Sequence, residues 1–422
     1  MSNPLQTSPS FRKLLAAVTL SGIGAEVSAV ALPLVALLIL DASAYEIGIL
    51  AALAYVPVII VTPFAGVLSD RYPPRIVNGL ADITRGVAIL FVPTLAWMDL
   101  LSIPVLFIIA LAVGVIEAIS SVAHHSILPA VVPSNQIEKG NTSLSMSYSV
   151  TEVAGPGLGG VLVQFFGAPI ALLVDSFGFL ASGILLLRMK TIPRKSESNS
   201  PPANWFVLVA WGFKFLWDEK RLLWLGICGG VSNMLLFAFT TVLSIFIVSA
   251  LGLEPWAFGA VLALGAVGGV VGALVAGGIR DRVSLPSTLL GAEIAGGIGV
   301  VIVSLGSVPN GGWLSFVIVG LGMLVYSGAM GVYNVHSMST RQLLSPPEYL
   351  GRVTASYRLL SHGAIPLGAI LGGVAAGVWG SGIVILAAGA LLVLWALALR
   401  LTPFMQLRTV GRAALSDGVE AT

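Results

Sequence analysis

Long apolar runs alternate with short polar segments along the whole chain. Twelve of these runs have the roughly 20 residues that a helix needs to cross a bilayer. The period-two alternation of a membrane barrel is absent, and within lipid only helices or closed barrels satisfy every backbone polar group. The pattern therefore predicts an all-α membrane protein with twelve transmembrane helices. They cover Leu14–Leu40, Glu46–Leu68, Arg75–Trp97, Leu101–Ala123, Ser143–Phe166, Pro169–Arg188, Leu222–Ala250, Trp256–Ile279, Pro286–Ser307, Trp313–Ser337, Val353–Val378 and Gly382–Arg400.

The positive charges indicate on which side of the membrane each loop lies. If the amino terminus is cytoplasmic, the Lys and Arg residues between the apolar runs all fall in cytoplasmic segments, as Arg71, Lys139 and Arg282 do. The loops on the opposite side contain no Lys or Arg. Because cytoplasmic loops are enriched in these residues, we expect both termini in the cytoplasm.

Polar segments divide the predicted helices into two halves. Residues 1–188 form an amino-terminal six-helix half, and residues 222–400 form a carboxyl-terminal one. Residues 189–221 form a cytoplasmic linker, within which the short apolar stretch Trp205–Trp217 predicts an interfacial helix. Residues 401–422 are predicted to be a disordered cytoplasmic tail.

Composition excludes several classes of protein. Apolar residues make up 57% of the chain and charged residues only 9%, and the mean hydropathy is +0.98. A soluble domain carries roughly 25% charged residues, so this surface faces lipid. A net charge of +2 gives no reason to expect a nucleic-acid partner. Cys228 is the only cysteine, which excludes an internal disulfide. No metal-ligand spacing, cofactor motif or catalytic nucleophile–base pattern is found, so we expect no cofactor and no enzyme.

The two halves of the chain repeat each other. Asp281 follows Asp70 by 211 residues, and Glu293 follows Asp82 by the same interval, in a chain of 422 residues. With six helices in each half, equivalent points lie on the same side of the membrane. The repeat is therefore parallel, and it predicts two pseudo-symmetric bundles related by an axis along the membrane normal.

A charged turn stands at the equivalent place in each half, after the second helix. The first turn resembles the signature loop of the major facilitator superfamily, with Pro73-Pro74 in place of the usual Gly-Arg. The matching positions and their repeat mates, which we predict to form a gating loop, are Gly66, Asp70, Arg71, Arg75, Asp281 and Arg282. The resemblance implies that Asp70 docks on the amino end of the eleventh helix when the cytoplasmic side is closed, because unpaired N–H groups attract an anion there. Arg71 and Arg75 are equally consistent with simple anchoring at the cytoplasmic surface.

Three further stretches resemble the bacterial subgroup that contains enterobactin exporters and macrolide efflux proteins, a subgroup of drug:proton antiporters. They are Asp82-x-x-Arg85, Leu128-Pro129 through Gly160, and Gly351-Arg352-Val353. In such antiporters a glycine- and proline-rich fifth helix bends between the halves. The residues that match are Gly155, Pro156, Gly159 and Gly160. Close helix packing by small residues explains them equally well.

Charged residues inside the membrane are costly and therefore mark candidate sites. Asp82 and Arg85 are three residues apart, so they share one helical face and are predicted to pair. The remaining candidates for the substrate cavity and proton coupling are Glu26, Glu117, Glu152 and Glu293. Glu26 is foremost because it lies near the middle of the first helix, with no basic residue within one turn.

The resemblance and these carboxyls together predict a secondary transporter. We expect it to export an amphiphilic small molecule, either drug-like, macrolide-like or siderophore-like, in exchange for protons. The resemblance to this bacterial subgroup implies a place in the lipid bilayer of the inner membrane, where we expect the protein to act as a monomer. Two alternatives remain open from the sequence. One is a transporter of opposite direction, such as a lysophospholipid flippase or an uptake or facilitative carrier, and the other is a non-transporting membrane receptor or scaffold.

Overall fold

The structure is a computed structural model, and its regular elements are helices throughout the described residues, which confirms the predicted all-α class. It describes residues 8–190, 205–280, 283–308, 311–346 and 350–407, without the side chains of 62–71, 122, 125, 134, 205–210, 280, 350–352 and 406–407. By length and composition, eleven helical segments of these residues suit a membrane crossing.

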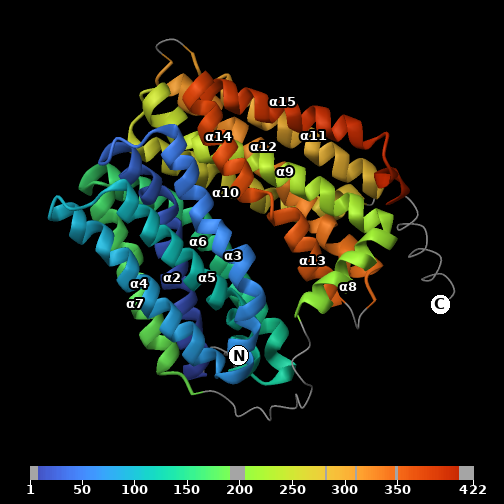
Figure 1. Cartoon of the computed structure of the whole chain (residues 1–422), viewed down its shortest axis with the longest axis horizontal. Coiled ribbons are helices and arrows are strands. Elements are labelled where there is room, and N and C mark those ends of the chain that lie inside the picture. Colours follow the sequence, from blue (N-terminus) through green and yellow to red (C-terminus); the bar gives the residue numbers. More distant parts are fainter. Residues whose placement is uncertain (1–7, 191–204, 281–282, 309–310, 347–349, 408–422) are drawn as a thin grey trace. The chain divides into compact units, whose positions relative to one another are not determined.

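The chain folds into two compact units (Figure 1). Unit 1 comprises Met1–Pro202 with Glu254–Ala263, and unit 2 comprises Ala203–Leu253 with Leu264–Thr422. The helices before the linker region are α2 (Pro9–Leu38), α3 (Ala44–Arg71), α4 (Pro74–Trp97), α5 (Ile103–Ile127), α6 (Ile137–Phe166) and α7 (Ala168–Leu187). Those after it are α8 (Trp205–Asp218), α9 (Lys220–Ser244), α10 (Pro255–Arg280), α11 (Leu285–Ser304), α12 (Trp313–Leu344), α13 (Leu350–His362), α14 (Ile365–Trp379) and α15 (Ser381–Leu399).

Helix pairing inside each unit follows the predicted repeat. In unit 1, α2 packs on α6 and α7, while α4 packs on α5 and α7. In unit 2, α9 packs on α14 and α15, while α11 packs on α12 and α15. The turns repeat as well: Gly167 between α6 and α7 has φ 85°, and Gly380 between α14 and α15 has φ 84°. Both positions need glycine because a Cβ disfavours this backbone conformation.

The predicted fifth span, Ser143–Phe166, lies inside α6. This helix has 30 residues and is therefore about 45 Å long, enough to cross a bilayer. It is not among the eleven segments that qualify by composition. Glu152, Gln164 and the hydroxyl side chains of its first half make it more polar than the other helices.

The predicted span Val353–Val378 is two helices rather than one. α13 ends at His362 and α14 begins after Gly363 and Ala364. Pro366 explains the break, because proline has no N–H to bond the carbonyl of the residue four positions earlier and its ring clashes with that carbonyl. Irregular backbone at membrane depth is tolerated only where protein or a water-filled cavity surrounds it.

The predicted helix at Trp205–Trp217 is present as α8. Its 14 residues span about 21 Å, too short for a membrane crossing. Leu216 is fully buried in the core of unit 2, so α8 packs against its bundle. Just beyond α8, Arg221 donates a 2.6 Å hydrogen bond to Glu219, and this bond holds the pKa of Glu219 below its ordinary value.

Candidate functional site

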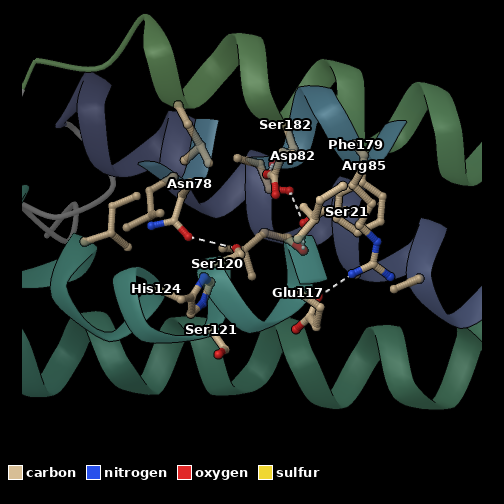
Figure 2. Close-up of a pocket in the computed structure, with 18 of the residues that line it drawn as sticks. Ser21, Asn78, Asp82, Arg85, Glu117, Ser120, Ser121, His124, Phe179 and Ser182 are labelled. Carbon is tan, nitrogen blue, oxygen red and sulfur yellow. Dashed lines mark hydrogen bonds and ion pairs between the residues drawn. The ribbon is translucent and has the colours of Figure 1, made fainter. Parts of the chain in front are cut away.

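Unit 1 contains a cavity of about 320 Å³ among α2, α4, α5, α6 and α7 (Figure 2). Its size lies at the lower end of the range for small-molecule sites. Polar side chains from all five helices point into it. They are Ser21, Asn78, Asp82, Arg85, Glu117, Ser120, Ser121, His124, Tyr148 and Ser182.

The predicted pairing of Asp82 with Arg85 is wrong. Arg85 forms an ion pair with Glu117 on α5, and its guanidinium carbon lies 4.1 Å from the ring centroid of Phe179. Asp82 instead accepts a 2.6 Å hydrogen bond from Ser182 on α7 (Figure 2). The helical spacing of Asp82 and Arg85 permits a contact, but both side chains reach neighbouring helices, which offer a carboxylate to one and a hydroxyl to the other.

Two further contacts in the polar lining also join neighbouring helices. Ser120 on α5 donates a 3.0 Å hydrogen bond to the amide oxygen of Asn78 on α4. His124 on α5 contacts the hydroxyl of Tyr148 on α6. Within the described residues, no three His, Cys, Asp or Glu side chains gather in a way that could hold a metal ion.

Glu26 lies outside this cavity and faces α6. A Cβ built on Gly155 would overlap the Cβ of Glu26, so the two helices touch at this glycine. Glu152 precedes Gly155 by about one helical turn on α6 and therefore lies near this contact. No cation lies within ion-pair distance of Glu26 in the part of the chain that the structure describes. The lone carboxyl predicted from the sequence therefore has a second carboxyl as its neighbour.

The glycine motif of α6 serves close packing inside unit 1. A Cβ on Gly159 would lie 3.1 Å from the Cα of Val27 on α2. A Cβ on Gly160 would lie 3.0 Å from the Cα of Gly259, at the start of α10. Pro156 lies within the same continuous helix. Each of these glycines removes the side chain that would keep the backbones apart.

Unit 2 contains a larger cavity of about 470 Å³, lined by α9, α11, α12, α13 and α15. Its polar lining consists of Ser232, Asn233, Glu293, Tyr326, Tyr333, Asn334, Ser337, Arg341, Gln342, Thr354, Tyr357, Arg358, Ser361 and His362. The third helix of each half thus supplies a carboxyl to the cavity of its own unit, Asp82 in unit 1 and Glu293 in unit 2.

Glu293 is almost completely buried, with 1% of its surface exposed. Its Oε1 accepts a 2.9 Å hydrogen bond from Ser232 on α9, and the thiol of Cys228 lies 3.7 Å from the same oxygen. Its Oε2 has no hydrogen-bond partner among the described residues. A buried carboxyl held only by neutral donors stands out, because a buried charge is normally paired.

The break between α13 and α14 borders this cavity. Asn233 on α9 donates a 2.8 Å hydrogen bond to the carbonyl of Ser361, one of the acceptors freed where the helix is interrupted. The hydroxyl of Ser361 in turn contacts Nδ1 of His362 at 2.9 Å. Discontinuous helices in transporters place such polar backbone at binding sites. The sequence analysis missed Asn233, and Pro366 within an apolar run is the signal that points to the break.

The predicted gating loop is described only in part. Only the backbone is described for Gly66, Asp70 and Arg71, as part of α3, and Asp281 and Arg282 lie outside the described residues. Arg75 is described: its Nη1 donates to the carbonyls of Met189 at 2.7 Å and Leu187 at 3.3 Å. A cation at the carboxyl end of a helix is favourable, so Arg75 caps α7.

The known proteins that this chain resembles are transporters. The multidrug efflux pump Tap of Mycolicibacterium fortuitum is 26% identical over 85% of this chain and 87% of its own length. The enterobactin exporter EntS of Salmonella typhimurium is 24% identical over 88% of this chain and 87% of its own length. These two relatives agree with the subgroup that the sequence motifs indicate.

The fold is also similar to that of a solved transporter. The crystal structure of the nucleoside transporter NupG matches with a TM-score of 0.72 and 15% sequence identity, over 94% of this chain and 98% of NupG. The family model described as Major Facilitator Superfamily matches residues 14–365. The chain therefore belongs to the major facilitator superfamily and is a multi-pass membrane transporter rather than an enzyme.

Proposed function

We propose that this transporter exports an amphiphilic small molecule in exchange for protons, by alternating access. Relatives named as a multidrug efflux pump and an enterobactin exporter support export of such molecules. The observation that carries the proton exchange is Glu293, a carboxyl in the unit 2 cavity whose hydrogen-bond donors among the described residues are neutral side chains. Ionised carboxylates are costly in such a place unless they are paired, and binding a proton removes that cost.

The available driving force is sufficient. One charge that crosses 100 mV contributes about 2.3 kcal/mol, and one unit of pH gradient contributes about 1.4 kcal/mol. Their sum of roughly 3.7 kcal/mol supports a concentration gradient of several hundred-fold for a neutral molecule exchanged for one proton. Exchange follows if the transporter carries either the exported molecule outward or the proton on this carboxyl inward, but not both in the same step.

Glu26 in unit 1 is the proposed second proton carrier. Because Glu152 lies near it, we expect a smaller loss of proton-driven export when Glu26 alone is replaced. The charge on either carboxyl disfavours ionisation of the other, so Glu152 can take up a proton in place of Glu26. We therefore expect Glu26→Gln to reduce proton-driven export severalfold, and Glu26→Gln with Glu152→Gln to abolish it. The measurement is uptake into energised everted vesicles of a compound first identified by a thermal-shift screen of amphiphiles.

Glu117→Gln provides the matched control for these variants. Glu117 is already paired with Arg85, and glutamine keeps an oxygen for that guanidinium. Proton-driven export should therefore persist in Glu117→Gln. If Glu117→Gln loses coupling while the Glu26 and Glu152 variants keep it, the assignment of the unpaired carboxyls as proton carriers is wrong.

We also propose that both termini are cytoplasmic, on the distribution of Lys and Arg. A cysteine at Asp99, in a background with Cys228 replaced by serine, should react with an impermeant maleimide added to intact cells. A cysteine at Ser196 should react only after permeabilisation, because the linker is predicted to be cytoplasmic. The reverse labelling pattern would invert the topology.

A further inference from the structure

The unit 2 cavity carries two guanidinium groups near one of its ends. Arg341 lies three residues before the end of α12, and Arg358 lies eight residues after the start of α13. At about 1.5 Å per residue, they are roughly 5 Å and 12 Å from these helix ends. Both side chains line the cavity. His362, four residues after Arg358 on α13, lines the same cavity.

Neither guanidinium has a carboxylate partner within the described part of the chain. The ion pairs found there join Arg85 to Glu117 and Arg221 to Glu219. Glu293 lines the same cavity, but it accepts its hydrogen bonds from Ser232 and Cys228. Arginine inside a membrane bundle is costly and is normally paired. The cavity therefore presents positive charge that these residues leave unneutralised.

Arg341 is held in a fixed orientation. Its guanidinium carbon lies 4.2 Å from the ring centroid of Tyr357, and its Nε donates to the carbonyl of Ser337 at 3.4 Å. The hydroxyl of Tyr357 lies 3.2 Å from Oγ of Ser337, which fixes the ring as well. Within the described part of the chain, the bond from Nε leaves both terminal nitrogens of Arg341 available. A planar guanidinium held in this way presents a fork of N–H donors that matches a carboxylate or a phosphate.

The cavity of unit 1 has the opposite balance of charge. There Arg85 is the cation, and Glu117 neutralises it. Asp82 adds a second carboxyl to that lining. Unit 2 has two cations and one carboxyl in its cavity. The contrast shows that the positive charge in unit 2 is not a general feature of the repeat.

We propose that the unit 2 cavity binds an acidic group, a carboxylate or a phosphate, of the exported molecule between Arg341 and Arg358. Asn334 and Gln342 supply further polar contacts at the cavity wall. Leu236, Met338 and Leu392 supply an apolar surface for the rest of the molecule. The substrate class is therefore an acidic amphiphile. That the bound molecule is the exported one rests on the proposed export function. The presence of an anion-binding site does not depend on that function.

The test uses two probes that share one ring system and differ in charge. Binding of 1-naphthoate and of 1-naphthylmethylammonium is measured by equilibrium dialysis with the full chain in phosphatidylcholine nanodiscs, against empty nanodiscs. We expect saturable binding of the acid at millimolar or lower concentration and at least about tenfold weaker binding of the cation. Arg341→Gln and Arg358→Gln should each weaken binding of the acid about tenfold, since hydrogen bonds to charged groups have this strength.

Several controls separate this effect from misfolding. Arg358→Lys keeps the charge and should retain most of the affinity for the acid. Arg400→Gln removes an arginine outside the cavity and should leave that affinity unchanged. Thermal unfolding of each variant shows whether the fold is intact. No saturable binding of 1-naphthoate, equal binding of the two probes, or unchanged affinity in both well-folded glutamine variants would overturn the proposal.

The acidic headgroup of a lipid is the other molecule with the chemistry to bind between the two arginines. Nanodiscs that contain phosphatidylglycerol should bind 1-naphthoate as well as phosphatidylcholine nanodiscs do, if the site serves a soluble acid. Displacement of the acid by phosphatidylglycerol would assign the cavity to a lipid and contradict the proposal. Binding of 1-naphthoate needs no proton gradient, so it should persist in Glu293→Gln. The anion site is therefore tested independently of the proposed proton exchange.

Discussion

Glu293→Gln is expected to abolish proton-driven export while downhill exchange of the same molecule continues. Glutamine has nearly the shape of a protonated glutamate and can accept the hydrogen bond from Ser232, but it cannot release a proton. Glu293 is the only carboxyl in the described lining of the unit 2 cavity, so no neighbour can replace it. The expected loss is therefore larger than for Glu26, which has Glu152 beside it.

Two measurements on proteoliposomes separate coupling from transport. Uphill accumulation driven by an imposed pH gradient should fall to the background of empty liposomes. Exchange of labelled for unlabelled compound, without a gradient, should continue within a few-fold of the wild-type rate. Ser232→Ala is the companion variant: it removes a hydrogen bond to Glu293 but keeps the carboxyl, so coupling should persist with an altered pH dependence. Full uphill transport by Glu293→Gln would show that its proton is not the one exchanged.

Gly272→Ala is expected to destabilise unit 2 strongly. A Cβ built on Gly272 of α10 would overlap the carbonyl oxygen of Gly328 on α12 and lie 2.7 Å from its carbonyl carbon. These atoms belong to the backbone, so no side-chain rotation can relieve the clash and the helices must move apart. Inserting one methyl group into a tightly packed contact typically costs about 1–3 kcal/mol, and a backbone contact belongs at the upper end of this range.

Gly277→Ala is the matched control on the same helix. A Cβ built on Gly277 has no atom within 4 Å, and alanine favours a helix over glycine by about 1 kcal/mol. Thermal unfolding in detergent should therefore show a melting temperature lowered by several degrees for Gly272→Ala and unchanged or raised for Gly277→Ala. Equal melting temperatures for the two variants would contradict the close packing of α10 on α12.

The membrane class and the repeat could be predicted because local signals carry them. Apolar runs of spanning length need only composition and length to be recognised, and most of them coincide with the helices observed. The 211-residue interval between Asp82 and Glu293 indicated equivalent halves, and the helix pairing inside each unit agrees with it. The break in the eleventh span was missed, although Pro366 supplied the signal, because hydropathy averaged over the run hides a single residue.

The partners of the charged residues were decided only by the tertiary structure. Their spacing along one helix makes a pair of Asp82 and Arg85 reasonable. In the structure, Arg85 instead pairs with Glu117, 32 residues later, and Asp82 accepts a hydrogen bond from Ser182, 100 residues later. Glu293 likewise depends on Ser232, which comes 61 residues earlier. A sequence shows which side chains share a helical face, but the helix that packs against that face depends on the fit of whole surfaces. The sequence by itself thus determined that carboxyls would lie inside the bundles, while tertiary packing decided which of them lies beside a cation, as Glu117 does, and which accepts hydrogen bonds from neutral donors, as Glu293 does.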